Sequence, residues 1–111
     1  MKSEFHTPNR TLRLTIPGDL LSTNVDSLRA EILYLIDSET SANAWQFLEL
    51  DLKAARMVDS AGLNLIVALI RIAEQRSRRI RVLIESPKIH RTFLFTRLDR
   101  HVDLVGPTGN P

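Results

Sequence analysis

Hydrophobic and polar residues alternate along the chain with two different periods. Residues 11–16 read TLRLTI, in which every second side chain is apolar, and this pattern is typical of a half-buried strand. Pro17 and Gly18 then mark a turn. From Val25, apolar side chains recur three, seven, ten and eleven positions further on, which predicts an amphipathic helix over residues 25–37.

The middle of the chain contains the two most apolar segments. Residues 45–52 read WQFLELDL, a run too short for a typical helix, and predict a central strand that is buried on both faces. A long apolar helix is expected to begin near Ser60 and to end at Gln75 or Arg76.

The last third repeats the same alternation. Residues 78–84 predict a strand, and residues 87–98 predict a helix with proline in its first turn. This helix should turn Ile89, Phe93 and Leu94 inward. Residues 102–105 add a short final strand.

Strands and helices therefore alternate, which indicates an α/β fold with helices packed against a sheet. We expect a flexible leader over residues 1–10, a single domain over residues 11–105 and a flexible tail over residues 106–111. A chain of 111 residues with 43% hydrophobic residues is long enough for one core.

The composition of the chain bears on whether it crosses a membrane, is secreted or forms disulfides. The longest apolar run, residues 65–70, is six residues, whereas crossing a bilayer takes roughly 20. The first ten residues contain no apolar stretch of a secretory signal. Cysteine is absent, which removes disulfides and thiolate zinc sites. We expect a soluble cytoplasmic protein with no membrane insertion.

Charge is unevenly distributed although the formal net charge is only +2. Residues 1–52 carry eight acids and four bases, whereas residues 71–100 carry nine bases and three acids. Arg76, Arg78, Arg79 and Arg81 raise the hypothesis of nucleic-acid binding. The alternation of two of these arginines with apolar residues and the lack of interleaved aromatic residues favour a solvated sheet face without direct nucleic-acid contact. We expect these arginines to contact an acidic surface on a protein partner.

Signatures of enzymes are missing. A nucleophile elbow needs glycine two residues before its serine, but Val58 stands before Ser60. The four glycines form no phosphate-binding loop, and the three histidines have no metal-ligand spacing. A phosphate-accepting receiver domain using Asp51 is a remaining alternative, but the turn at residues 17–19 supplies one acid where a Mg²⁺ site needs a pair. We expect no catalytic residues, no metal and no cofactor.

Residues 57–63, MVDSAGL, join a loop to the start of the long helix. The first N–H groups of a helix have no partner within the helix, so Asp59 or Ser60 is expected to cap them. Gly62 allows another part of the backbone, or a partner, to approach closely. One interpretation is a capped helix packed on the sheet. The other is an exposed Ser60 that accepts a phosphoryl group, since a helix N-terminus favours an anion.

Leu63 and Val67 lie one turn apart on the same helix. They either pack against the sheet or a neighbouring helix, or remain exposed and extend a partner surface beside Ser60.

These segments resemble the STAS domain of bacterial anti-sigma factor antagonists. The similar stretches are residues 48–52, residues 58–63 with the helix after them, residues 17–20 with Leu28 and Arg29, and residues 86–99. The resemblance covers about residues 11–105 and implies a STAS-like fold, in which helices pack against a mixed sheet of four to five strands.

The resemblance also implies a function without catalysis. In this family the serine after the motif's aspartate, here Ser60 after Asp59, is phosphorylated by a serine kinase that is also the anti-sigma factor. A phosphatase reverses the modification. The residues that this resemblance assigns to the site are Ser60 and Asp59. From these and from the residues around them we expect a partner-binding surface made of Asp19, Asp59, Ser60, Ala61, Gly62, Leu63 and Val67.

Two positions depart from the family pattern. Leu21 stands where the family often has an acid, and Ala61 stands where it commonly has a second serine. The same family shape also serves as a subunit of membrane assemblies, such as the small partner of a lipid-transporting ABC transporter, which docks on the ATPase. Leu20 and Leu21, in place of a polar pair, fit a more apolar interface of that kind.

Overall fold

The computed structural model describes residues 1–107 and contains one five-stranded sheet in the order β1-β2-β3-β4-β5. β1 runs antiparallel to β2, and all other neighbours are parallel. The elements in chain order are β1 (Lys2–His6), β2 (Thr11–Thr15), α1 (Val25–Asp37), β3 (Phe47–Leu52), α2 (Ser60–Gln75), β4 (Arg79–Ile84), α3 (Pro87–Phe95), the 3-10 helix η1 (Leu98–Arg100) and β5 (Asp103–Val105). This is the mixed α/β sheet expected from the alternation of periods.

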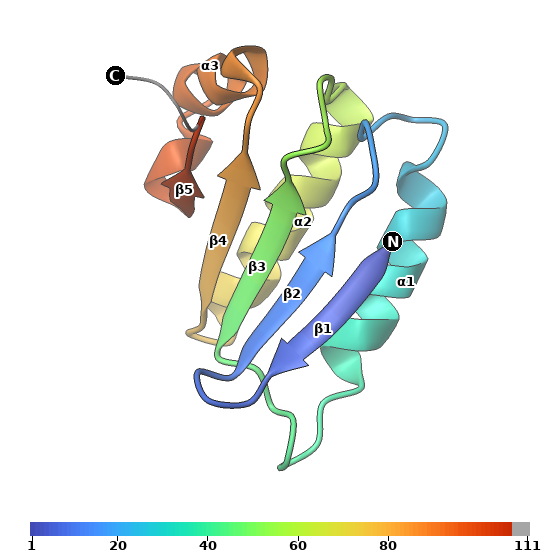
Figure 1. Cartoon of the computed structure of the whole chain (residues 1–111), viewed down its shortest axis with the longest axis vertical. Coiled ribbons are helices and arrows are strands. Elements are labelled where there is room, and N and C mark those ends of the chain that lie inside the picture. The colour runs from blue at the N-terminus through green and yellow to red at the C-terminus, as the bar shows by residue number, and fades with distance from the viewer. Residues whose placement is uncertain (108–111) are drawn as a thin grey trace.

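The helices lie mainly on one side of the sheet. α1 and α2 pack behind it, and α3 stands beyond the carboxyl end of β4, so that within residues 1–107 no helix covers the front face (Figure 1). Alternate strand residues turn toward the helices and are buried. The central ones are Leu12, Leu14, Leu48, Leu50, Leu52, Ile80, Val82 and Ile84.

The structure differs from the expectation at the start of the chain. Residues 1–10 are not simply a leader, because Lys2–His6 form β1 and pair with all of β2. Only Phe5 in this strand carries a large apolar side chain, so the alternating pattern is too weak to predict it. At the other end, residues 108–111 of the expected tail lie outside the described residues.

The third helix is shorter than expected. α3 ends at Phe95, and Arg97 takes a left-handed conformation with φ 61° that stops the helix before η1. Ile89 and Phe93 are buried as expected, but Leu94 is 48% exposed. The prediction for Leu94 was wrong because one step along a helix rotates a side chain by about 100°, away from the face that Phe93 buries.

The expectation that β3 is buried on both faces holds only in its middle. Glu49 is 6% exposed on the front face, where no helix covers the strand, and Phe47 is exposed. Arg13 of β2 and Arg81 of β4 flank the Glu49 carboxylate in register and shield it from solvent.

Two loops meet at the carboxyl edge of the sheet and hold the start of α2. Leu20, after β2, forms a parallel bridge with Val58, after β3. The Leu20 carbonyl accepts a hydrogen bond from the Asp59 N–H at 3.2 Å. This backbone lies so close to α2 that a Cβ on Gly62 would stand 2.3 Å from the Leu20 oxygen. Only glycine fits at this position without a shift of the loop.

We expect Gly62→Ala to destabilise the fold by about 2–4 kcal/mol, because the added methyl group must displace a backbone carbonyl. Urea unfolding followed by circular dichroism measures the change. Gly18→Ala is the matched control, since no atom lies within 4 Å of a Cβ built on Gly18. Equal unfolding midpoints for the two variants would contradict the tight contact.

Candidate functional site

Asp59 is the N-cap residue of α2 and joins the helix to the loop after β2. Its Oδ1 accepts a hydrogen bond from the Gly62 N–H at 2.9 Å, and its Oδ2 accepts one from the Ser22 N–H at 2.8 Å. The sequence left the cap open between Asp59 and Ser60, and the structure assigns it to Asp59. Both carboxylate oxygens are thus used in positioning backbone.

Asp19 makes the opposite contact, from the loop after β2 to the loop after β3. Its Oδ1 accepts hydrogen bonds from the N–H groups of Arg56 and Met57, at 2.8 and 3.1 Å. Asn24 supports this loop from within, since its Oδ1 accepts from the Leu21 N–H and its Nδ2 donates to the Asp19 carbonyl. Asp19 and Asp59 therefore fasten the two loops to each other from both sides.

Ser60 is the first residue of α2 and is exposed. Because Asp59 supplies the cap, the Ser60 hydroxyl is not needed for it, and within residues 1–107 it forms no hydrogen bond. Its position at the helix N-terminus places it near the partial positive charge of the helix dipole. A hydroxyl that is free, exposed and held on a rigid support can accept a group without rearrangement of the fold.

The residues around Ser60 differ in exposure. Leu63 is half-buried and packs against the core, and Val67 is half-buried one turn further along α2. Ala61 is also half-buried, and Gly62 is buried under the Leu20 carbonyl. Little of the α2 surface at these four positions is therefore available for contact with a partner.

Four exposed residues that the sequence did not indicate as site residues lie in the segments around Ser60. Met57 is 51% exposed in the loop before α2, and Asn64 is exposed one turn after Ser60 on the same face. Ser22 and Thr23 are exposed in the loop after β2. The spacing of four residues from Ser60 could have indicated Asn64 from the sequence. Met57, Ser22 and Thr23 join this surface only because two loops that are distant in sequence meet there.

The arginines that suggested a recognition surface are paired within the chain. Arg76 and Arg78 contact Asp37 at 2.6 Å and Glu39 at 2.5 Å, respectively. Both guanidinium groups also lie over the ring of the buried Trp45, at 5.8 and 4.6 Å from its centroid. The Arg78 hydrogen bond is the main cause that holds the pKa of Glu39 below its usual value.

The two arginines of β4 are paired as well. Arg79 lies 3.1 Å from Asp103 of β5, and Arg81 lies 3.8 Å from Glu49 of β3. All four arginines of residues 76–81 thus have an acidic partner within the chain, and their contact with an acidic surface of another protein stays a prediction.

Among residues 1–107 no group of three or more histidine, aspartate or glutamate side chains is arranged to hold a metal ion. Over the same residues no helix combines the length and apolar character that a membrane span requires.

The capping role of Asp59 predicts a pH dependence. Hydrogen bonds from Gly62 and Ser22 lower the pKa of Asp59, so its carboxylate stabilises the fold above the unfolded-state pKa of about 3.9, and this contribution is lost as pH falls through the lower folded-state value. We expect Asp59→Asn, whose amide nitrogen cannot accept a hydrogen bond, to weaken stability at pH 7 and to flatten its decline below pH 4. Thermal unfolding between pH 2.5 and 7 measures both.

Glu31→Gln, which removes an exposed acid of α1, is the control for the loss of one charge. A stability profile of Asp59→Asn that parallels the parent chain throughout would show that the two contacts of this carboxylate do not contribute.

Comparisons with known proteins place this geometry in a family. A family model described as "Mlab, STAS domain" matches residues 3–106. The comparison with curated proteins gave no match.

Three solved structures share the fold. An anti-sigma factor antagonist from Mycobacterium paratuberculosis is 21% identical, with a TM-score of 0.74 over 94% of this chain and 82% of that one. The Bacillus cell fate determinant SpoIIAA in its phosphorylated form is 23% identical, with a TM-score of 0.70 over 95% and 90%. A sulfate transporter family protein from Wolinella succinogenes is 11% identical, with a TM-score of 0.70 over 90% and 80%. These likenesses show the shared fold, and the family match over nearly the whole chain shows that the protein belongs to the STAS domain family.

Proposed function

We propose that this chain is a protein-binding module that is switched by phosphorylation of Ser60, as an anti-sigma factor antagonist is. The observation that carries the proposal is the exposed, unbonded Ser60 hydroxyl at the start of α2, beside a cap that Asp59 already provides. The STAS domain is generally a non-enzymatic binding module, so the chemistry belongs to the partner. We therefore infer that the chain itself is not an enzyme.

The modification is a phosphoryl transfer from ATP held by a partner serine kinase. The Ser60 Oγ forms a bond to the γ-phosphorus, the bond from that phosphorus to the leaving ADP oxygen breaks, and the hydroxyl proton passes to a base of the kinase. Hydrolysis of the phosphoserine by a phosphatase restores the hydroxyl.

The phosphate changes the surface by charge. It adds roughly −1.5 to −2 next to the Asp59 carboxylate and near the exposed Met57 side chain. A partner that covers Met57, Ser60 and Asn64 would then have to bury a dianion, which is costly without a matching cation. In this proposal the unmodified chain binds a kinase that is also an anti-sigma factor, and thereby frees the sigma factor in the cytoplasm. The solved phosphorylated form of SpoIIAA supports the analogy.

A second candidate function is that of a STAS subunit docked on the ATPase of a membrane assembly. Its support is the apolar character of the loop edge, where Met57 is exposed and Leu21 is half-buried, together with the shared fold of a sulfate transporter family protein. The same end of α2 would form the contact, and Ser60 would not need to be modified.

The proposal is tested by purifying the tagged chain from its native cells and mapping phosphate by mass spectrometry. We expect phosphate on the peptide that contains Ser60 and co-purification of a serine kinase. Binding of that kinase, measured by calorimetry, should fall at least about tenfold for Ser60→Asp and stay within about twofold for Ser60→Ala, since alanine adds no charge.

Ser86→Asp is the matched control. Ser86 is the N-cap of α3, and aspartate is an equally good cap, so this variant adds the same charge at another helix start. Recovery of an ATPase in place of a kinase, with no phosphate on Ser60, favours the second candidate. Equal kinase binding by Ser60→Asp and Ser60→Ala would overturn the switch.

A further inference from the structure

The outward face of α3 combines cationic and apolar side chains. Lys88 and Arg91 are three residues apart, and Leu94 and Phe95 follow Arg91 by three and four, so all four share one side of the helix. Phe95 is 88% exposed and Leu94 is 48% exposed, whereas the opposite side of the helix is buried in the core. An aromatic ring left almost entirely in solvent has no role in the packing of this chain.

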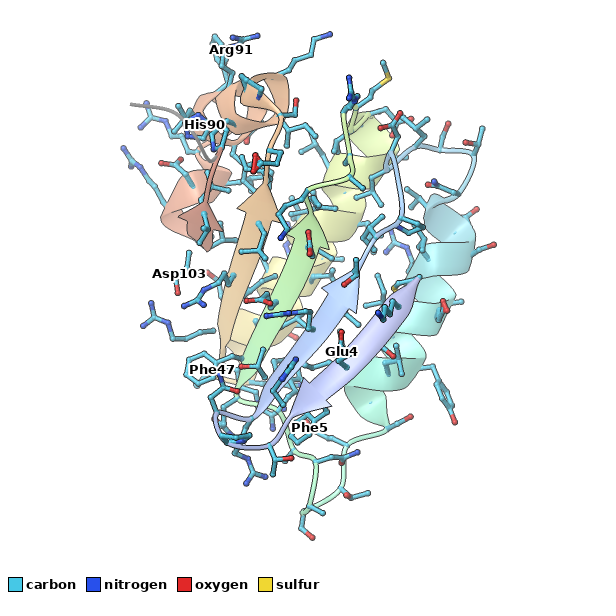
Figure 2. The ribbon with its side chains drawn as sticks, in the orientation of Figure 1. Glu4, Phe5, Phe47, His90, Arg91 and Asp103 are labelled. Atoms are coloured by element: carbon cyan, nitrogen blue, oxygen red, sulfur yellow. The ribbon has the colours of Figure 1, made fainter. Side chains whose placement is uncertain are left out.

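The cations of this face differ from those of residues 76–81. Within residues 1–107, Lys88, Arg91 and the nearby Arg97 form no ion pair, while all four arginines between 76 and 81 do. Figure 2 shows Arg91 at the outer end of the molecule, pointing away from the sheet. No acid of residues 1–107 is therefore paired with these three cations.

Arg97 is held in an unfavourable backbone conformation. Its φ of 61° lies in the left-handed region, one position beyond the C-cap Thr96 of α3. Helices that end in this way usually have glycine at this position, because a side chain there is strained. Ser77 takes the same conformation one position beyond the C-cap of α2, so the conformation alone assigns Arg97 no role; Arg97 matters here because it adds a cation two residues from the exposed Phe95.

We propose that the α3 tip, defined as Lys88, Arg91, Leu94, Phe95 and Arg97, docks on an anionic lipid surface. The guanidinium and ammonium groups meet lipid phosphates, and the Phe95 ring enters the region between headgroups, which accepts an aromatic side chain without a complementary pocket. This docking goes beyond the proposed switch and does not require Ser60.

The size and shape of the tip favour lipid over a protein partner. A stable protein interface covers about 800 Å² on each partner, more than one face of a nine-residue helix presents. α3 also stands at a corner of the molecule beyond the sheet (Figure 1). Since three cations and two apolar side chains give only weak membrane affinity, the docking is reversible and salt-dependent.

The test is flotation of the purified chain with vesicles of phosphatidylcholine containing about 30% phosphatidylglycerol, at about 50 and 200 mM NaCl, against vesicles of phosphatidylcholine alone. We expect binding to the anionic vesicles only, and a loss of several-fold at the higher salt. Phe95→Ser and Arg97→Gly should each lower the bound fraction by about three- to tenfold.

Two measurements distinguish docking through the α3 tip from a loss of folding and from a non-specific effect of removing one positive charge. Arg97→Gly removes the strained conformation, so its melting temperature should stay equal to that of the parent or rise by about 2–5 °C while binding falls. Arg71→Gln removes an exposed arginine of α2 that has no ion-pair partner within residues 1–107, and should leave vesicle binding within about twofold.

Ser60→Asp should also leave vesicle binding unchanged, which keeps this proposal separate from the phosphorylation switch. The proposal is overturned if anionic vesicles bind no more than neutral ones, or if Arg71→Gln lowers binding as much as Arg97→Gly. Binding of poly(Glu,Tyr) or duplex DNA through the same residues, without vesicle binding, would assign the tip to an acidic protein or to nucleic acid and would equally overturn it.

Discussion

Crossed contacts between carboxylates and backbone N–H groups, at the edge where β2 and β3 end, organise the functional part of this molecule. Asp19 accepts from the loop before α2, and Asp59 accepts from the loop before α1. Each loop thus satisfies N–H groups of the other, and the lack of a Cβ on Gly62 lets the Leu20 carbonyl lie close against α2. Together with the bridge between Leu20 and Val58, these contacts fix the start of α2 and give the exposed Ser60 a defined setting.

Charge in the remainder of the chain has two separate uses. Arg76 and Arg78 neutralise Asp37 and Glu39 and stack on Trp45, so they hold the end of α1 to the end of α2. Glu49 is a buried carboxylate on the front of the mixed sheet, which no helix of residues 1–107 covers, and the flanking Arg13 and Arg81 offset the cost of its burial. Within residues 1–107, the cations of the α3 tip form no ion pair of this kind.

The sequence alone was enough for most of the architecture. The two hydrophobic periods predicted α1, α2 and the three central strands, because each of these elements buries a continuous face. β1 was missed because its pairing with β2 depends on backbone hydrogen bonds that leave little trace in the side chains of KSEFH. Leu94 was assigned to the core because a short helix offers too few turns for its buried face to be located from spacing alone.

The candidate site was predicted in part. The motif located Asp59, Ser60 and Gly62, since capping and close approach are local requirements. The contacts of Asp59 with Ser22, and of Asp19 with Arg56 and Met57, join residues about 37 positions apart, and no local pattern reveals such pairs. The ion pairs of Arg76, Arg78, Arg79 and Arg81 were not predicted for the same reason, because their acidic partners lie in other elements.

The division of charge along the chain also bears on how the molecule folds. Residues 1–52 carry eight acids and four bases, so the remaining residues hold five acids and eleven bases, and the two segments attract each other before any strand has paired. Parallel pairing of β2 with β3 and of β3 with β4 requires closure of long loops, which is slow in an uncharged chain. The opposite net charges of the two segments thus favour their early encounter. This attraction weakens as salt screens it.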